Sequence, residues 1–179
     1  MPIQMMMKID GVVGESKSFK HQGWADVMSW NWGMTSNRKL SQTIDGDKTS
    51  FNEISIVKAI GSDSSDVRRL YAEGALIPSV KLTMFPAVAK REVAMDYVDI
   101  KLEGVLIKSI VTGGGVDDMF FKEHITLLFD KVRFEYKTID AKSKVSAEDA
   151  ADDFLWNVTD NTKWKQATPE VVQELDQAG

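Results

Sequence analysis

Two histidines and one Gly-Glu-Ser tripeptide are the groups in this 179-residue chain that could serve in catalysis or metal binding. His21 and His124 stand far apart in the sequence, and neither has a carboxylate at the spacing of a metal site. A polar surface or strand-end position is therefore the favoured interpretation of both. A serine nucleophile would need a Gly-x-Ser-x-Gly turn, which residues 14–16 do not supply. We expect no catalytic residues and no enzyme activity.

A glycine run and two acidic pairs raise the question of phosphate or cation binding. Residues 112–115 (Thr-Gly-Gly-Gly) lack both the Lys-Ser/Thr and the Gly-x-Gly-x-x-Gly patterns of phosphate loops, and they precede a strand instead of a helix. Neither Asp117-Asp118 nor Asp45-Gly46-Asp47 extends to the calcium-loop pattern. The chain has no cysteine, which excludes disulfides and thiolate ligands. No metal and no cofactor is predicted.

Composition and charge indicate one soluble domain with an acidic extension. Apolar residues make up 43% of the chain and charged residues 27%, which suits a domain with a sizeable core. Residues 1–139 carry equal numbers of acidic and basic side chains, whereas residues 140–179 carry nine acidic and four basic ones. A balanced body without a basic stripe argues against nucleic acid as a partner. We predict a domain over residues 1–139 and an acidic C-terminal extension over 140–179, partly packed on that domain.

Neither a membrane span nor a secretory leader is expected. No apolar run approaches the roughly 18 residues that a spanning helix needs. The first eight residues lack the basic and apolar regions of a signal peptide. The sequence therefore predicts synthesis in the cytoplasm and no membrane insertion.

Three of the five tryptophans fall at positions of one parity between residues 24 and 32. In a regular strand, Trp24, Trp30 and Trp32 would share one face, while Ser29 and Asn31 would point the other way. Such an aromatic wall belongs to a buried core or to a platform on which a ligand stacks. Burial is favoured because Trp30 and Trp32 lie in the middle of the expected strand.

Periodicity and turn residues predict a mainly β fold. The expected strands cover residues 5–10, 24–34, 51–59, 93–112, 124–138 and 154–158, with a further strand ending at Pro86. A polar loop is expected over residues 35–49. One short helix is predicted from Asp66 to Glu73, preceded by N-capping residues and ended by Gly74. Residues 169–175 have the spacing of a terminal amphipathic helix.

The two longest strands, over residues 93–112 and 124–138, each change the parity of their apolar residues midway. In the first the change occurs at Gly104, where the apolar set passes from even to odd positions. A bulge or strong bend has this effect and lets one strand serve two sheets. We therefore predict a barrel-like pair of packed antiparallel sheets with the helix on its flank.

Both faces of the strand around residues 105–111 are apolar, so both need cover. A domain with one short helix has little to place on the outer face. We therefore expect a neighbouring subunit to cover the side that carries Val105, Ile107 and Val111.

Several segments, in order, are similar to the haemolysin-coregulated protein (Hcp) family over residues 1–138. The most specific are residues 99–114 (Asp-Ile-Lys-Leu-Glu-Gly-Val-Leu-Ile-Lys-Ser-Ile-Val-Thr-Gly-Gly) and 127–137 (Leu-Leu-Phe-Asp-Lys-Val-Arg-Phe-Glu-Tyr-Lys). Residues 5–10, 14–16, 30–33, 55–58 and the expected helix add to the match. Residues 154–158 also resemble the C-terminal end of some members of the family.

The resemblance implies a structural subunit of the bacterial type VI secretion tube, related in fold to phage tail-tube proteins. Members form hexameric rings with a wide pore, and the rings stack into a tube that a contractile sheath expels. The implied partners are other copies of the chain, the sheath and spike proteins, and small effectors held in the pore. The protein would be cytoplasmic before export and then secreted without a signal peptide.

The resemblance also implies roles for particular residues. Ser29 and Asn31 would line the pore, because that side of their strand faces the lumen in the family. The loop over residues 35–49 corresponds to the family's extended loop, which reaches an adjacent ring or subunit, although its usual glycines are replaced here by charged residues. The ring-stacking candidates in that loop are Arg38, Lys39, Asp45, Asp47 and Lys48. The alternative function is a monomeric carbohydrate-binding β-sandwich module that uses the tryptophans as a platform.

Overall fold

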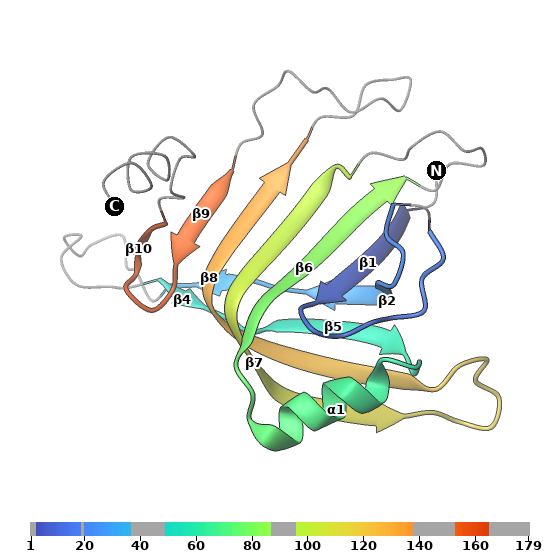
Figure 1. Cartoon of the computed structure of the whole chain (residues 1–179). Helices are drawn as coiled ribbons and strands as arrows, with labels where there is room; N and C mark the ends of the chain where they lie inside the picture. Colours follow the sequence, from blue (N-terminus) through green and yellow to red (C-terminus); the bar gives the residue numbers. More distant parts are fainter. Residues whose placement is uncertain (1–2, 19, 37–48, 87–95, 138–152, 165–179) are drawn as a thin grey trace, which may run out of the picture.

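The computed structural model describes residues 3–18, 20–36, 49–86, 96–137 and 153–164. These residues form ten strands and one helix (Figure 1). The elements are β1 (Ile3–Ile9), β2 (Ala25–Asn31), β3 (Met34–Thr35), β4 (Ser50–Phe51), β5 (Ile54–Ala59), α1 (Ser64–Glu73), β6 (Ile77–Pro86), β7 (Val98–Gly113), β8 (Lys122–Tyr136), β9 (Phe154–Asn157) and β10 (Thr162–Lys163).

Six strands close into an antiparallel barrel in the order β8, β5, β2, β1, β6, β7, because β7 pairs again with β8. Strands β9 and β10 extend the sheet from β8, and β3 pairs with β4 in a separate ladder. The prediction of a mainly β, barrel-like fold with one short helix on its flank is confirmed. Closure removes most of the free sheet edges that an open β-sheet would expose.

The pairing of β7 with β8 runs the whole length of both strands and holds the two halves of the barrel together. The first half of β7 lies between β6 and β8, whereas β8 pairs with β5 in its first half and with β9 in its second. Each long strand thus takes part in two differently oriented parts of the sheet. Figure 1 shows both strands turning sharply near their middle.

The turn in β7 is built at Gly104, whose φ of +64° lies in the left-handed region. The ladder keeps its register across this point, since Glu103 pairs with Lys131 and Val105 with Phe129. A Cβ at Gly104 would lie 2.5 Å from a carboxylate oxygen of Asp130, so another residue would have to displace that side chain in addition to adopting a left-handed backbone. The predicted parity change follows from this bend.

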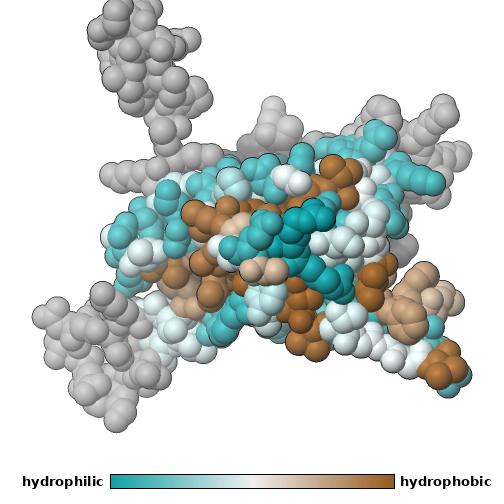
Figure 2. All heavy atoms as spheres, turned by 60° about the horizontal axis from the view of Figure 1, so that its bottom comes forward, coloured by the Kyte–Doolittle hydropathy of each residue, from teal (hydrophilic) through white to brown (hydrophobic). Residues whose placement is uncertain are grey.

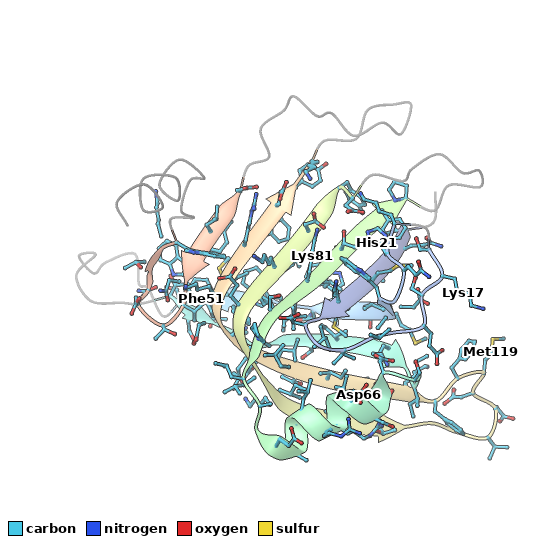
Figure 3. The ribbon with its side chains drawn as sticks, in the orientation of Figure 1. Lys17, His21, Phe51, Asp66, Lys81 and Met119 are labelled. Carbon is cyan, nitrogen blue, oxygen red and sulfur yellow. The ribbon has the colours of Figure 1, made fainter. Side chains whose placement is uncertain are left out.

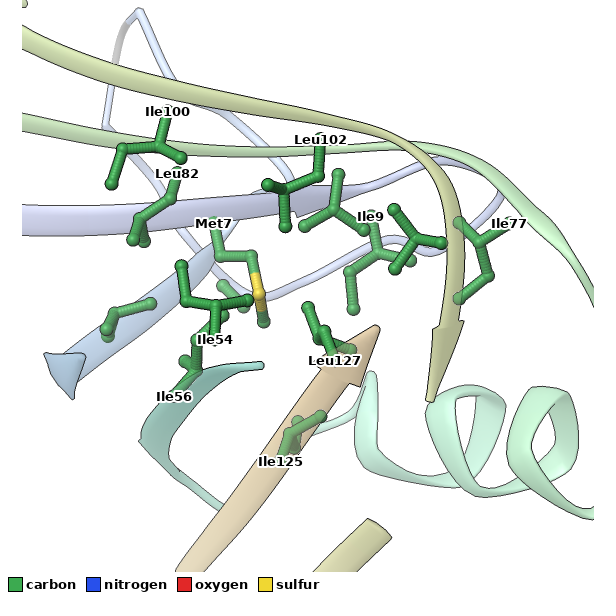
Figure 4. Close-up of a cluster of buried hydrophobic side chains, with 14 of the residues drawn as sticks. Met7, Ile9, Ile54, Ile56, Ile77, Leu82, Ile100, Leu102, Ile125 and Leu127 are labelled. Atoms are coloured by element: carbon green, nitrogen blue, oxygen red, sulfur yellow. The ribbon is translucent and has the colours of Figure 1, made fainter. Parts of the chain in front are cut away.

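Inward-facing side chains on both sides of the bend share one core. Ile100 and Leu102 precede the bend and Val105 follows it, and all three are buried. Figure 4 labels Ile100 and Leu102 together with eight other members of the core, which are Met7, Ile9, Ile54, Ile56, Ile77, Leu82, Ile125 and Leu127. The apolar residues that the sequence placed on alternate parities therefore meet inside one barrel.

A bulge in β2 corrects the expectation that three tryptophans share a face. The register with β5 shifts between Val27 and Ser29, so the residues that face inward change parity there. Ala25 and Val27 are buried before the bulge, and after it Trp30 and Trp32 pack against the core. Trp24 lies on the opposite face, where it forms a T-shaped pair with the His21 ring at a centroid distance of 4.8 Å.

Helix α1 begins two residues before the predicted start and ends as predicted at Gly74, whose φ is +61°. Its first turn is fastened to the barrel by a buried group of charges. The Lys58 ammonium lies 2.8 Å from Glu123 and 3.1 Å from Asp63, and Arg68 lies 3.1 Å from the second Glu123 oxygen. Each buried charge has an opposite charge beside it, which is the condition under which burial is tolerated.

Of the remaining expected elements, some lie in the described residues and can be compared, and others lie outside them. The predicted strand over residues 154–158 is confirmed as β9, and the strand predicted over residues 51–59 is divided into β4 and β5. The C-terminal helix over residues 169–175 and most of the extension over 140–179 lie outside the described residues. The domain boundary at residue 139 therefore stays a prediction.

We expect Gly104→Ala to lower the free energy of unfolding by about 2–4 kcal/mol, because alanine is strained at positive φ and its Cβ would collide with Asp130. Urea unfolding followed by tryptophan fluorescence measures the change. Gly113→Ala is the matched control, since it lies in the same strand and its added Cβ meets no atom within 4 Å. Equal losses in both variants would contradict the role of the bend.

Candidate functional site

A band of small polar side chains crosses four neighbouring strands on the outside of the barrel. Asn31 of β2 pairs with Ser55 of β5, Ser55 with Thr126 of β8, and Thr126 with Ser109 of β7. Asn31 and Ser55 are exposed and the other two are half-buried. The outward side chains of β2, β5, the first half of β8 and the second half of β7 are called the polar face below.

A second row runs beside the first on the polar face. It consists of Ser29, Val57, His124 and Val111, each the cross-strand partner of the next. Neither row contains a lysine, arginine, aspartate or glutamate. These two rows therefore offer hydrogen-bonding groups without fixed charge.

The sequence identified only part of this surface. Ser29 and Asn31 are exposed on the side opposite Trp30 and Trp32, as predicted. Ser55, Ser109 and Thr126 were not singled out, because a polar residue on a strand is common and only the register brings these three into line. His124 belongs to the same face and is exposed, as expected of a surface histidine.

Charged residues lie at the margin of the polar face beside the bend. Lys108 and Glu53 form an ion pair there, and both side chains are exposed. The hydrogen bond from the Lys108 ammonium lowers the pKa of the Glu53 carboxyl, with a smaller contribution from the Glu53 backbone.

The outer surface of the other half of the barrel has the opposite character. Four basic residues, Lys8, Lys81, Lys101 and Arg133, pair in sequence across β1, β6, β7 and β8. Directly opposed like charges are unfavourable, so they require neighbouring carboxylates.

Carboxylates lie beside most of this row. Lys81 is 3.0 Å from Asp99, Lys101 is 2.8 Å from Glu103, and Arg133 is 2.6 Å from Asp153. Farther along, Glu135 accepts a hydrogen bond from Lys137 and raises the pKa of that ammonium. Figure 3 shows Lys81 on this surface, which is called the charged face below.

The four strands of the polar face end at two edges without a strand partner among the described residues. The second half of β7 pairs with β8 on one side only, and α1 lies near it. The end of β2 pairs with β5 but not with β1, since the β1 ladder stops at Asp26. Unpaired backbone N–H and C=O groups at such edges can accept a strand from another chain.

The expected subunit-contact residues need correction. Val105 and Ile107 are buried in the core of their own chain, so a neighbouring subunit cannot cover them. Val111 is 61% exposed and lies on the polar face. The apolar residue that does face outward near the bend is Leu106. The strand has two apolar faces, as predicted, but Val105 and Ile107 lie on the inner one. A register shift between Ile107 and Ser109 then turns Val111 outward.

The ring-stacking candidates cannot be compared with the structure, and the position expected of His21 is wrong. Arg38, Lys39, Asp45, Asp47 and Lys48, the ring-stacking candidates, lie outside the described residues. His21 is buried, against the expectation of a surface position: it stacks on Phe85 at 4.6 Å, and Nε2 lies 3.1 Å from Asp96. Within the described part of the chain no three histidine or acidic side chains are placed to hold a metal ion. No helix there is long and apolar enough to cross a membrane.

Comparison with known proteins identifies the family. The model of the family described as "Type VI secretion system effector, Hcp" matches residues 6–136, which is most of the chain. The chain belongs to the Hcp family. It is 28% identical over 165 residues to protein hcp1 of Pseudomonas aeruginosa, covering 91% of this chain and 99% of that protein.

Solved structures agree with the barrel. A type six secretion system protein superimposes with a TM-score of 0.81 at 20% identity, covering 91% of this chain and all of that one. Hcp1 from Salmonella typhimurium gives a TM-score of 0.72 at 22% identity, covering 92% and 100%. At these identities the likeness concerns the fold alone. Hcp proteins are secreted, and they are structural tube proteins, not enzymes, in agreement with the sequence prediction.

We predict that Lys108→Gln raises the pKa of Glu53 toward its ordinary value, because the amide cannot stabilise the carboxylate by charge. Since the pair lowers this pKa, its stabilisation is present above the ordinary value and is lost as pH falls through the lowered one. NMR titration of the Glu53 carboxyl measures the shift, with Lys101→Gln on the charged face as the control. An unchanged Glu53 titration in Lys108→Gln would show that the ion pair does not form in solution.

Proposed function

We propose that this Hcp protein is a ring-forming subunit of the type VI secretion tube, with the polar face turned toward the pore. Six copies would form a ring, and rings would stack into the tube that the sheath expels. The observation that carries the proposal is the uncharged band of Asn31, Ser55, Thr126 and Ser109, which spans a four-stranded sheet from one unpaired edge to the other.

The two unpaired edges support assembly side by side. They lie on β2 and β7, at opposite sides of the four-stranded sheet. If the β7 edge of one copy meets the β2 edge of the next, the polar bands of successive copies join into one continuous lining. A closed ring leaves no edge unpaired, which removes the aggregation hazard that a free edge presents.

The difference between the two faces supports the orientation. The charged face carries a row of four basic side chains with carboxylates among them, and it suits an exterior that is solvated or that meets the sheath. The polar face suits a hydrated lumen, because small hydroxyl and amide groups bind water and cargo without strong charge attraction. We propose that small effectors are held there weakly and released at delivery.

The proposed role implies the binding partners of the protein and its route out of the cell. Ring subunits would act with other copies of the chain and with the sheath and spike proteins of the secretion system. The protein would be made in the cytoplasm and leave the cell with the expelled tube. The carbohydrate-module alternative loses support, because Trp30 and Trp32 pack against the barrel core and are not displayed as a platform.

Light scattering and negative-stain imaging of the purified chain test the proposal. We expect the mass of a hexamer and ring images with six-fold symmetry. A monomer at all protein and salt concentrations would rule out the ring function.

Asn31→Gln and Ser55→Gln test the orientation. We expect both variants to form rings of unchanged mass, because each residue points away from the core, while retention of a small effector in the pore changes several-fold. Co-purification of the effector with the ring measures retention, and Lys101→Gln on the charged face is the control. Loss of rings, or unchanged retention in both variants, would argue against a pore position for the polar face.

A further inference from the structure

The turn between β7 and β8 presents an unusual group of exposed apolar side chains. Val116 is 104% exposed, Met119 86%, Phe120 56% and Phe121 61%. Residues 114–121 are called the tip below. The tip projects from the body beyond the end of β5, and its apolar side chains stand at the lower right in Figure 2, with Met119 labelled in Figure 3.

The tip is a hydrogen-bonded turn. The Gly115 N–H donates to the Asp118 carboxylate at 2.8 Å, and the Asp118 N–H donates to the Gly115 carbonyl at 3.2 Å. The Phe121 ring folds over Gly114, where a Cβ would lie 2.3 Å from it, and the Phe121 carbonyl accepts a hydrogen bond from Ile60. A turn held in this way exposes apolar groups at little further entropic cost on binding.

A matching surface lies at the other end of the same sheet, beside the bend, where the polar face ends in apolar side chains. Leu106 and Leu128 are direct cross-strand partners and are 39% and 41% exposed. Leu76, 64% exposed, immediately precedes Ile77, the partner of Val105, so it lies at the same level. These three leucines are called the distal patch below.

The tip cannot reach the distal patch of its own chain. Gly113, at the base of the tip, lies seven positions beyond Leu106 on β7, which is about 23 Å of strand. The tip and the distal patch therefore point to a contact between copies, with different surfaces on each partner. Such a head-to-tail contact closes into a ring where the rotation between copies allows it, and otherwise it propagates as a stack. The tip and the distal patch lie at opposite ends of the strands, whereas the ring is proposed to join through strand edges, so a stack is the arrangement that uses them.

We infer that the tip of one copy docks on the distal patch of a copy in the next ring, so that it forms a stacking contact in addition to any made by residues 35–49. This inference rests on the proposed ring. One tip on one patch buries on the order of several hundred Å² from both partners, which is less than a specific interface needs by itself. Repetition around a ring multiplies the contact, which favours a second ring over a single foreign protein as the partner.

Cysteine pairing tests the contact, since the chain has no cysteine of its own. Rings of Met119→Cys and rings of Leu128→Cys are prepared separately, mixed and oxidised. We expect disulfide-linked dimers on denaturing gels, at least five-fold above those from Met119→Cys mixed with Ile3→Cys. Ile3 is the control because it is 52% exposed but lies on β1, away from the distal patch. The native product should have twice the ring mass.

Three other results of the cysteine experiment would contradict either the stacking contact or the proposed ring. Dimers no more abundant than in the control mixture, with rings intact, would overturn the inference while leaving the ring function standing. Dimers confined to species of single-ring mass would place the contact within one ring and also overturn it. Wild-type protein that forms no rings would instead contradict the proposed function.

A second variant tests the energetic role of the tip. We expect Met119→Ser combined with Phe120→Ser to leave ring mass unchanged and to shorten ring stacks seen by negative stain at high protein concentration. Phe121 is kept because it packs on Gly114. Stacks of wild-type length would show that the tip does not join rings. Binding of a foreign protein to the wild-type tip, with stacks of equal length in the variant and the wild type, would also show that the tip does not join rings.

Discussion

The paired bend of β7 and β8 at Gly104 and Asp130 is the constraint on which the rest of the barrel depends. Glycine at positive φ lets β7 turn, and the Asp130 carboxylate fills the space that a side chain would take. Because the ladder keeps its register through the turn, two long strands serve both halves of one sheet. Without the bend the apolar residues on its two sides would point in opposite directions, and no common core would form.

The same bend divides the outer surface into two regions with different chemistry. Beyond it in β7 lies the polar face, with hydroxyl, amide and imidazole groups, and before it lies the charged face with its row of basic residues. Since both faces belong to one closed sheet, they look outward in different directions. A subunit of this kind can turn one surface to a lumen and the other to an exterior without moving any element.

Much of the fold follows from local pattern. Alternation of apolar residues located the long strands, and the parity change at Gly104 indicated the bend. The helix end at Gly74 follows from its left-handed backbone. The subunit-contact assignment failed at Val105 and Ile107, because a strand with two apolar faces carries no local mark of which face is inside. The single face assigned to the tryptophans failed because a bulge between Val27 and Ser29 shifts the alternation, and nothing in those residue types announces it.

By itself, the sequence determined the longer strands, the position of the bend, the short helix and the family, because each depends on neighbouring residues or on ordered motifs along the chain. Only the tertiary structure decided which polar residues share a surface. Asn31, Ser55, Thr126 and Ser109 come from four strands and align solely through cross-strand register. That register is set by closure of the barrel and by packing of the whole core, which no local segment contains.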